Sequence, residues 1–307
     1  MGEDKQREQV NFNEQESPGW ENKRLMKAPM TVYTPESELR HPKKLFREMK
    51  RDLGCSLGLA WRLAVRDLSA LYRQTFLGYL WAILPPLATS LTFILLNHTK
   101  IFEIRGIEIP YPVFVMTGTV FWQLFVDALN APLRIVSANR GMLSKINFPK
   151  EALILSGVVQ VLFSFLIKLG LLAATIFVFS VPMKETAALV PIMVMGFLVL
   201  GTLVGILLVP IGVLYQDVQQ ALTILISLFI FFTPVIYLPP EKGIMATLFK
   251  FNPLTPLFMM TREALFTGET RYLSVSLMVT GLACFLLILG WVIYRISLPV
   301  LIERMEA

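Results

Sequence analysis

The sequence predicts an all-α membrane protein built around six transmembrane helices. Three observations lead to this prediction. The 307 residues are 55% hydrophobic and only 16% charged, and their mean hydropathy is +0.61, whereas soluble domains carry about 25% charged residues. The charges gather at the ends of long uncharged segments. Six of these segments approach or exceed the roughly 20 residues that a helix needs to cross the hydrocarbon.

The first 55 residues are interpreted as a polar N-terminal tail. Both charge signs are mixed there and prolines recur, so we expect extended chain with at most one short helix over 43–53. The segment lacks the charged-then-apolar profile of a cleavable signal peptide.

Residues 56–75 are predicted to form an interfacial amphipathic helix. Apolar side chains recur at helical spacing, while Arg62, Arg66 and Arg73 fall on the opposite face. Such a helix rests its apolar face on lipid and keeps its arginines at head-group level.

The predicted transmembrane domain covers residues 76–295 and is followed by a cytoplasmic C-terminal tail, 296–307. Prolines inside or near the ends of several spans predict kinks or breaks. The six predicted spans are 76–97, 109–129, 152–181, 187–214, 218–238 and 272–294.

Two connections are predicted to contain helices. Residues 132–151 are basic and polar, and they are long enough for a short helix ended by Phe148 and Pro149. Residues 239–271 hold two semi-apolar stretches separated by prolines, which predicts two short helices dipping back into the outer membrane boundary. An even number of spans places both termini on one side. That side carries more Lys and Arg, so we expect it to be cytoplasmic.

Several function classes are disfavoured by what the sequence lacks. It contains no GxxxxGK[ST] phosphate loop, so any ATP-driven function needs a separate ATPase subunit. We find no Ser/His/Asp set, metal-ligand spacing or paired carboxylates, and therefore expect neither an enzyme nor a metal or cofactor on this chain. Half of the 28 Lys and Arg residues lie in the first 75 positions. Their place beside the first span favours a membrane surface over nucleic acid.

Two ionisable residues lie inside predicted spans, where a charge is costly and usually marks a cavity or relay. Asp127 is expected near the cytoplasmic end of its span, wetted or paired with Arg134. Lys168 lies deep in the third span, and its stem can reach either a wetted cavity or a structural contact. Because the two predicted depths differ, no direct ion pair between them is expected.

Four segments resemble the permease family of type-two ABC exporters, in particular the group that exports O-antigen, capsule and teichoic acid polymers. They are LYRQTFLGYLWAILPPL at 71–87, SANRGMLSKINFPKE at 137–151, YQDVQQALTILISLFIFFTPVIY at 215–237 and FNPLTPLFMMTREALFTG at 251–268. The four occur in the family's order.

The resemblance implies a homodimer with two ABC ATPase subunits that bind ATP and Mg. The implied substrate is a polyprenyl-linked polysaccharide, moved across the bacterial inner membrane and away from the cytoplasm. It also implies that residues 137–148 form a coupling helix seated in a cleft of the ATPase, with Met142 and Leu143 as buried contacts and Arg140 and Lys145 at the rim. The expected coupling residues are Asn139, Arg140, Met142, Leu143, Ser144, Lys145 and Phe148.

Three further sets of residues are expected to serve export. Arg62, Arg66 and Arg73 would receive the lipid phosphate. Residues 241–267, with Asn252, Pro253 and Arg262, would close an outer gate. Aromatic side chains either anchor the spans at the interface or line a path for sugar rings; the candidates for that path are Tyr79, Trp81, Trp122, Phe125, Phe232 and Tyr237.

Other functions remain open from the sequence. An exporter of a drug, heme or lipid with the same fold would place fewer aromatic rings along the pathway. A transporter not driven by ATP would need no ATPase partner. A lipid-modifying transferase would need clustered polar residues at the membrane face, which we do not find.

Overall fold

The computed structural model describes residues 42–73, 75–98, 109–145, 149–240 and 242–306. Lys43–Ala307 form one compact unit, in which every regular element of the described residues is helical. The elements are α1 (Pro42–Arg73), α2 (Leu80–His98), α3 (Tyr111–Ala138), α4 (Arg140–Lys145), α5 (Glu151–Val178), η2 (Glu185–Leu189), α6 (Val190–Gly212), α7 (Gln216–Phe229), η3 (Ile230–Phe232), α8 (Ile244–Phe251), α9 (Leu254–Arg262), η4 (Glu263–Thr267) and α10 (Leu273–Glu306).

Five described helical segments are long and apolar enough to cross a membrane: α2, α3, α5, η2 with α6, and α10. The sixth predicted span is not confirmed at full length. Its residues form α7, which has 14 residues, and the 3₁₀ turn η3. Together they reach about 27 Å, less than the ~30 Å of a hydrocarbon core.

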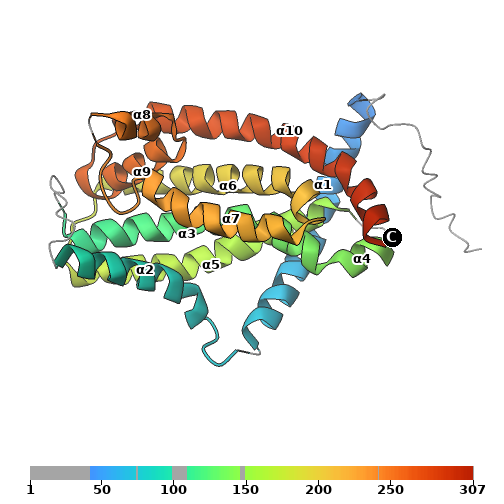
Figure 1. Ribbon diagram of the computed structural model, residues 1–307, viewed down its shortest axis with the longest axis horizontal. Coiled ribbons are helices and arrows are strands. Elements are labelled where there is room, and N and C mark those ends of the chain that lie inside the picture. The colour runs from blue at the N-terminus through green and yellow to red at the C-terminus, as the bar shows by residue number, and fades with distance from the viewer. Residues whose placement is uncertain (1–41, 74, 99–108, 146–148, 241, 307) are drawn as a thin grey trace, which may run out of the picture. The chain divides into compact units, whose positions relative to one another are not determined.

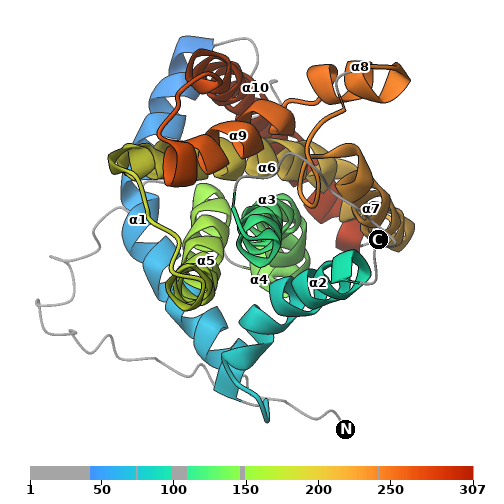
Figure 2. The same ribbon diagram turned by 90° about the vertical axis from the view of Figure 1, so that its left-hand side faces the viewer.

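Helix α3 lies at the centre of the bundle, with α2, α5 and α6 around it (Figure 2). Its closest neighbour is α6, because two glycines four residues apart leave room for the α3 backbone. A Cβ on Gly201 would lie 2.7 Å from the Ala128 Cβ, and one on Gly205 would lie 2.3 Å from the Leu129 carbonyl oxygen. Small residues at this spacing are how membrane helices approach one another closely.

The two ends of the unit differ. Helix α4 and the C-terminal part of α10 lie at one end, and α8 and α9 lie at the other (Figure 1). Two short helices therefore do occupy the predicted region 239–271, at the end opposite α4.

Helix α1 is longer than the predicted 56–75 segment, because it runs unbroken from Pro42. The described part of the predicted tail therefore continues into this helix; residues 1–41 lie outside the described residues. The C-terminal end differs in the same way, since α10 continues through Glu306 where a tail at 296–307 was predicted. Helix α3 likewise extends through Ala138, so the predicted connection 132–151 begins later.

Three faces divide the surface of α1. Met49, Ala60, Leu63 and Ala64 are buried and form a stripe against the bundle. Ala64 belongs to the predicted apolar face, whereas the other three lie outside it. The predicted apolar face remains largely exposed, with Leu57 and Trp61 each 62% exposed. The arginines occupy the third face.

Candidate functional site

A polar cavity of about 350 Å³ opens between α1, α2, α3 and α5. One side is apolar and includes Leu71 and Trp81, each about half exposed at 53% and 54%. The other side consists of polar side chains from the two facing helices α3 and α5: Gln123, Asp127, Arg134, Gln160, Ser164 and Lys168. The cavity is thus two-sided, with an apolar wall toward the surface and a polar wall toward the bundle.

Helical spacing explains why these polar residues meet. On α3, Gln123, Asp127 and Arg134 stand at i, i+4 and i+11, which lie on one face of a helix. On α5, Gln160, Ser164 and Lys168 recur every four residues. Each helix therefore carries one polar stripe, and packing α3 against α5 brings the stripes together.

An ion pair joins the two stripes. The Lys168 Nζ lies 2.5 Å from the Asp127 Oδ2, and the lysine side chain is 3% exposed. The expectation that these residues would not pair was wrong, and so was the placement of Asp127 near the end of its span, since α3 continues for eleven residues beyond it.

Asp127 and Lys168 lie at different heights along their helices, and the directions of their side chains explain why they still meet. Measured from the α4 end, Asp127 lies about 17 Å along α3 and Lys168 about 25 Å along α5. Side chains in a helix lean toward its N-terminus. Because α3 and α5 run in opposite directions (Figure 1), Asp127 and Lys168 lean toward each other.

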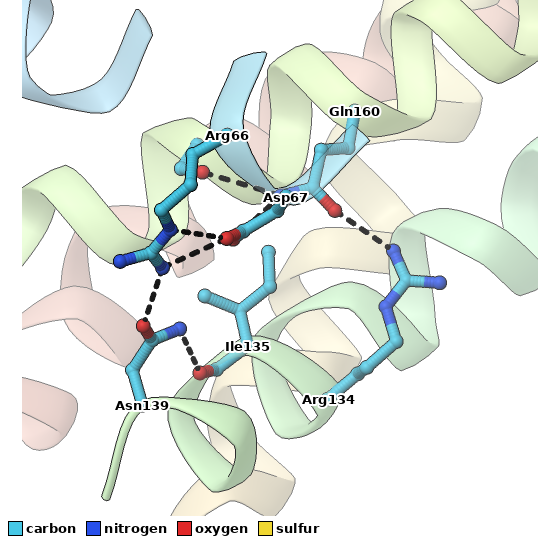
Figure 3. Close-up of polar contacts among 7 residues, drawn as sticks. Arg66, Asp67, Arg134, Ile135, Asn139 and Gln160 are labelled. Carbon is cyan, nitrogen blue, oxygen red and sulfur yellow. Dashed lines mark hydrogen bonds and ion pairs between the residues drawn. The ribbon is translucent and has the colours of Figure 1, made fainter. Parts of the chain in front are cut away.

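A hydrogen-bonded network lies at the end of the cavity nearest α4 (Figure 3). On α1, the Arg66 guanidinium is paired with Asp67 at 2.7 Å and its Nη2 donates to the Asn139 Oδ1 at 2.8 Å. The Gln160 Nε2 donates to the Asp67 Oδ2 at 3.3 Å, and the Arg134 Nη2 donates to the Gln160 Oε1 at 3.4 Å. The network thus links α1 to α3 and α5, and through Asn139 to the start of α4.

Each predicted coupling residue whose side chain the structure describes is buried or partly buried within this chain. Leu143 is 6% exposed and Met142 is partly buried against the same core, so Leu143 packs within its own chain. Asn139 is buried, with its Nδ2 donating to the Ile135 carbonyl at 2.9 Å. Arg140 Nη2 donates to the Val213 carbonyl. The side chains of Ser144 and Lys145, and Phe148 altogether, lie outside the described residues.

The three arginines predicted to receive a phosphate are exposed on α1. Arg66 is already engaged by Asp67 and Asn139. None of the three lines the cavity, whereas Arg134 does.

The six predicted path aromatics do not share one surface of the unit. Trp122 and Phe125 are buried at 4% and 6% exposure and their rings lie 5.8 Å apart. Tyr79, Trp81 and Phe232 are exposed. Tyr237 is half-buried and its hydroxyl donates to the Phe231 carbonyl.

Two of the predicted outer-gate residues, Arg262 and Asn252, hydrogen-bond to the end of η3 and to the non-helical segment that follows it. Arg262 is buried, donating to the carbonyls of Pro234 at 2.5 Å and Val235 at 2.6 Å. Asn252 is also buried: its Nδ2 donates to the Phe232 carbonyl at 2.9 Å, and its Oδ1 accepts from the Leu254 N–H. Pro253 is exposed at the start of α9.

The Glu263 carboxyl, next to α9, has a shifted pKa. Burial raises the pKa of the Glu263 carboxyl above its usual range, although the backbone N–H groups of Tyr272 and Arg271 partly oppose the shift.

The residues missed by the sequence analysis are Gln123, Gln160 and Ser164. The predictions from sequence considered only the ionisable residues inside the spans, and these three side chains are uncharged. Their spacing from Asp127 or Lys168 is the signal that could have found them, because a polar stripe on an otherwise apolar helix indicates a face turned away from lipid.

Long apolar helices packed around α3 define a polytopic membrane protein with a polar cavity between its helices. The chain belongs to the ABC-2 type transporter family, whose sequence profile matches residues 59–266. This confirms the family that the four segments resemble.

Curated relatives include export permeases from several bacteria. The chain is 26% identical over 236 residues to the O-antigen export system permease protein RfbA of Klebsiella pneumoniae, covering 75% of this chain and 89% of the relative. It is 29% identical over 220 residues to a Myxococcus xanthus protein of the same name, covering 70% and 83%. It is 25% identical over 242 residues to the polysialic acid transport protein KpsM of Escherichia coli, covering 76% and 91%.

Proposed function

We propose that this chain is the transmembrane subunit of an ATP-driven exporter that moves a lipid-linked polysaccharide across the bacterial inner membrane. The observation that carries the proposal is the match of residues 59–266 to the ABC-2 family, together with relatives named for O-antigen export and polysialic acid transport. Those relatives are covered over 89% and 91% of their length.

The assembly that fits this function is a homodimer carrying two ABC ATPase subunits, which bind ATP and Mg. Both termini face the cytoplasm, and α4 lies at that end. The homodimer encloses the path of the polymer, and α8 and α9 lie at the outer exit. Helix α7 with η3 then forms the sixth passage, shortened because the chain leaves the helix at Thr233 inside the bundle.

Helix α4 is the contact through which the ATPase moves the bundle. It packs against α10 and follows Asn139, which is hydrogen-bonded to α1. Because Leu143 packs inward, the surface of α4 available to a partner is on its other side, where Gly141 is exposed and a Cβ would meet no atom within 4 Å.

The test uses a large side chain at that exposed position. Gly141→Trp should leave the membrane unit folded but weaken co-purification with the proposed ABC ATPase partner, lower ATP turnover, and abolish surface polymer in a complemented export-deficient strain. Gly281→Trp is the control, because Gly281 is also exposed with open space around its Cβ but lies on α10.

Two results would redirect the proposal. If no ATPase copurifies with the wild-type chain, a transporter not driven by ATP or a membrane transferase becomes the better explanation. If the ATPase binds but export of a drug, heme or lipid is found in place of polymer, the substrate class is wrong.

A further inference from the structure

We propose that the cavity between α1, α2, α3 and α5 is a binding site for the phosphate head group of an amphiphile, with Arg134 as the residue that holds the phosphate. The site lies within one copy of the chain. Arg134 is exposed, as the arginines on α1 are, but unlike Arg62, Arg66 and Arg73 it lines the cavity.

The first argument is the balance of charge around the cavity. Lys168 is neutralised by Asp127, and Asp67 is occupied by Arg66. Arg134 has no carboxylate partner within the described part of the chain, and its contact with Gln160 is a long 3.4 Å hydrogen bond. The polar wall therefore carries one uncompensated positive charge. Arg134 lines a cavity between helices, where the surroundings are less polar than water. An arginine in such a place favours an anion that completes its hydrogen bonds.

The second argument is the chemistry of the surrounding walls. A guanidinium binds phosphate through two parallel N–H bonds, and Gln123 and Ser164 add neutral donors from the same wall. The opposite wall, with Leu71 and Trp81, is apolar and half exposed. A ligand that satisfies both walls has a phosphate at one end and a hydrocarbon chain at the other.

The third argument is size. At about 350 Å³, the cavity lies near the lower end of the 300–1,000 Å³ typical of ligand pockets. It can hold a head group, whereas a polymer or a complete lipid would extend outside it. The chain of the amphiphile would run along the exposed apolar surface of α1, toward Trp61.

The experiment measures binding to the full chain in phosphatidylcholine nanodiscs, without ATPase, so it does not depend on the proposed export function. The probes are farnesyl phosphate, farnesol as the neutral match, and inorganic phosphate. We expect farnesyl phosphate to bind at least tenfold more tightly than either of the other two. Arg134→Gln should weaken that binding about tenfold, and Arg134→Lys should restore part of it.

Matched variants separate the site from general charge. Arg51→Gln, which removes an exposed arginine of α1 outside the cavity, should leave binding unchanged. Ser164→Phe, which fills the cavity without changing charge, should weaken binding and provides the test if Arg134→Gln fails to fold. Equal binding by wild type and a folded Ser164→Phe or Arg134→Gln variant would overturn the proposal.

A competition arm identifies the source of the phosphate. If phosphatidylglycerol added to the nanodiscs displaces farnesyl phosphate, the site takes a bilayer lipid. If it does not, a polyprenyl phosphate is the ligand, which would connect the cavity to the exported substrate. Either result supports the head-group site, whereas tight binding of inorganic phosphate alone would refute the requirement for an amphiphile.

Discussion

At the scale of single residues, the Asp127–Lys168 pair neutralises two charges that line the polar cavity inside the bundle. Breaking a buried ion pair leaves one charge without its partner and costs about 3–5 kcal/mol, whereas replacing both residues by apolar ones can be nearly neutral. We therefore expect Lys168→Met to destabilise the chain, because it leaves the Asp127 carboxylate, which is 28% exposed, without its cation inside the bundle.

The double variant Lys168→Met with Asp127→Leu should recover most of the lost stability. Unfolding in detergent by titrated denaturant compares the two single variants, Lys168→Met and Asp127→Leu, with the double variant as a double-mutant cycle. Additive losses, with no recovery in the double variant, would show that the two residues act independently.

At the scale of helices, the contact between α3 and α6 depends on the absence of side chains at Gly201 and Gly205. Gly205→Leu would place atoms against the Leu129 carbonyl oxygen and the Pro132 ring, and overpacking of this kind typically costs about 1–3 kcal/mol. We expect a lower thermal unfolding temperature for purified Gly205→Leu. The control is Gly170→Leu, since Gly170 is exposed with no atom within 4 Å of its Cβ, and it should unfold at the wild-type temperature.

The exposed apolar face of α1 leads to a prediction about depth in the membrane. If this face rests on lipid, a chain in which Trp61 is the sole tryptophan should be quenched by phospholipids brominated near the head group. A second chain, in which Trp61 is replaced and Arg62→Trp is introduced on the basic face, should be quenched less. Stronger quenching of Trp61 by aqueous acrylamide than by brominated lipid would contradict the interfacial position.

At the scale of the whole bundle, one arginine of α10 holds three helices together at the α4 end. The Arg295 guanidinium lies 2.9 Å from the Asp52 Oδ2 on α1 and 2.7 Å from the Glu151 Oε1 on α5. Glu151 is 4% exposed, so losing its cation leaves a buried charge. We expect Arg295→Gln to loosen the start of α1, which would raise the rate of tryptic cleavage at Lys50 and Arg51.

The control for that prediction is Arg271→Gln, which removes an ion pair with Glu269 whose partners are 74% and 45% exposed. Exposed pairs contribute little to stability, so its cleavage rate should match the wild type. An unchanged rate in Arg295→Gln would show that α1 is retained by its apolar stripe alone.

Across the whole molecule, the sequence was sufficient for features set by local composition and spacing. It determined the membrane class, the five long spans, the short helices at 140–145 and within 239–271, and the family. Each of these depends on hydropathy over some twenty residues or on a contiguous motif. The same local signal misjudged the lengths of α1, α3 and α10, because helices do not have to end where the apolar segment ends.

The tertiary structure decided what depends on how helices are rotated and oriented against one another. Hydropathy identified Asp127 and Lys168 but not their pairing. They pair because α3 and α5 are antiparallel and the two residues are placed so that each side chain leans toward the other. Burial of Leu143 and the stripe of α1 against the bundle have the same origin, since an apolar residue can face lipid, a partner or its own core. The cavity forms where the polar stripes of α3 and α5 face residues of α1 and α2. How the helices pack against one another decides that arrangement.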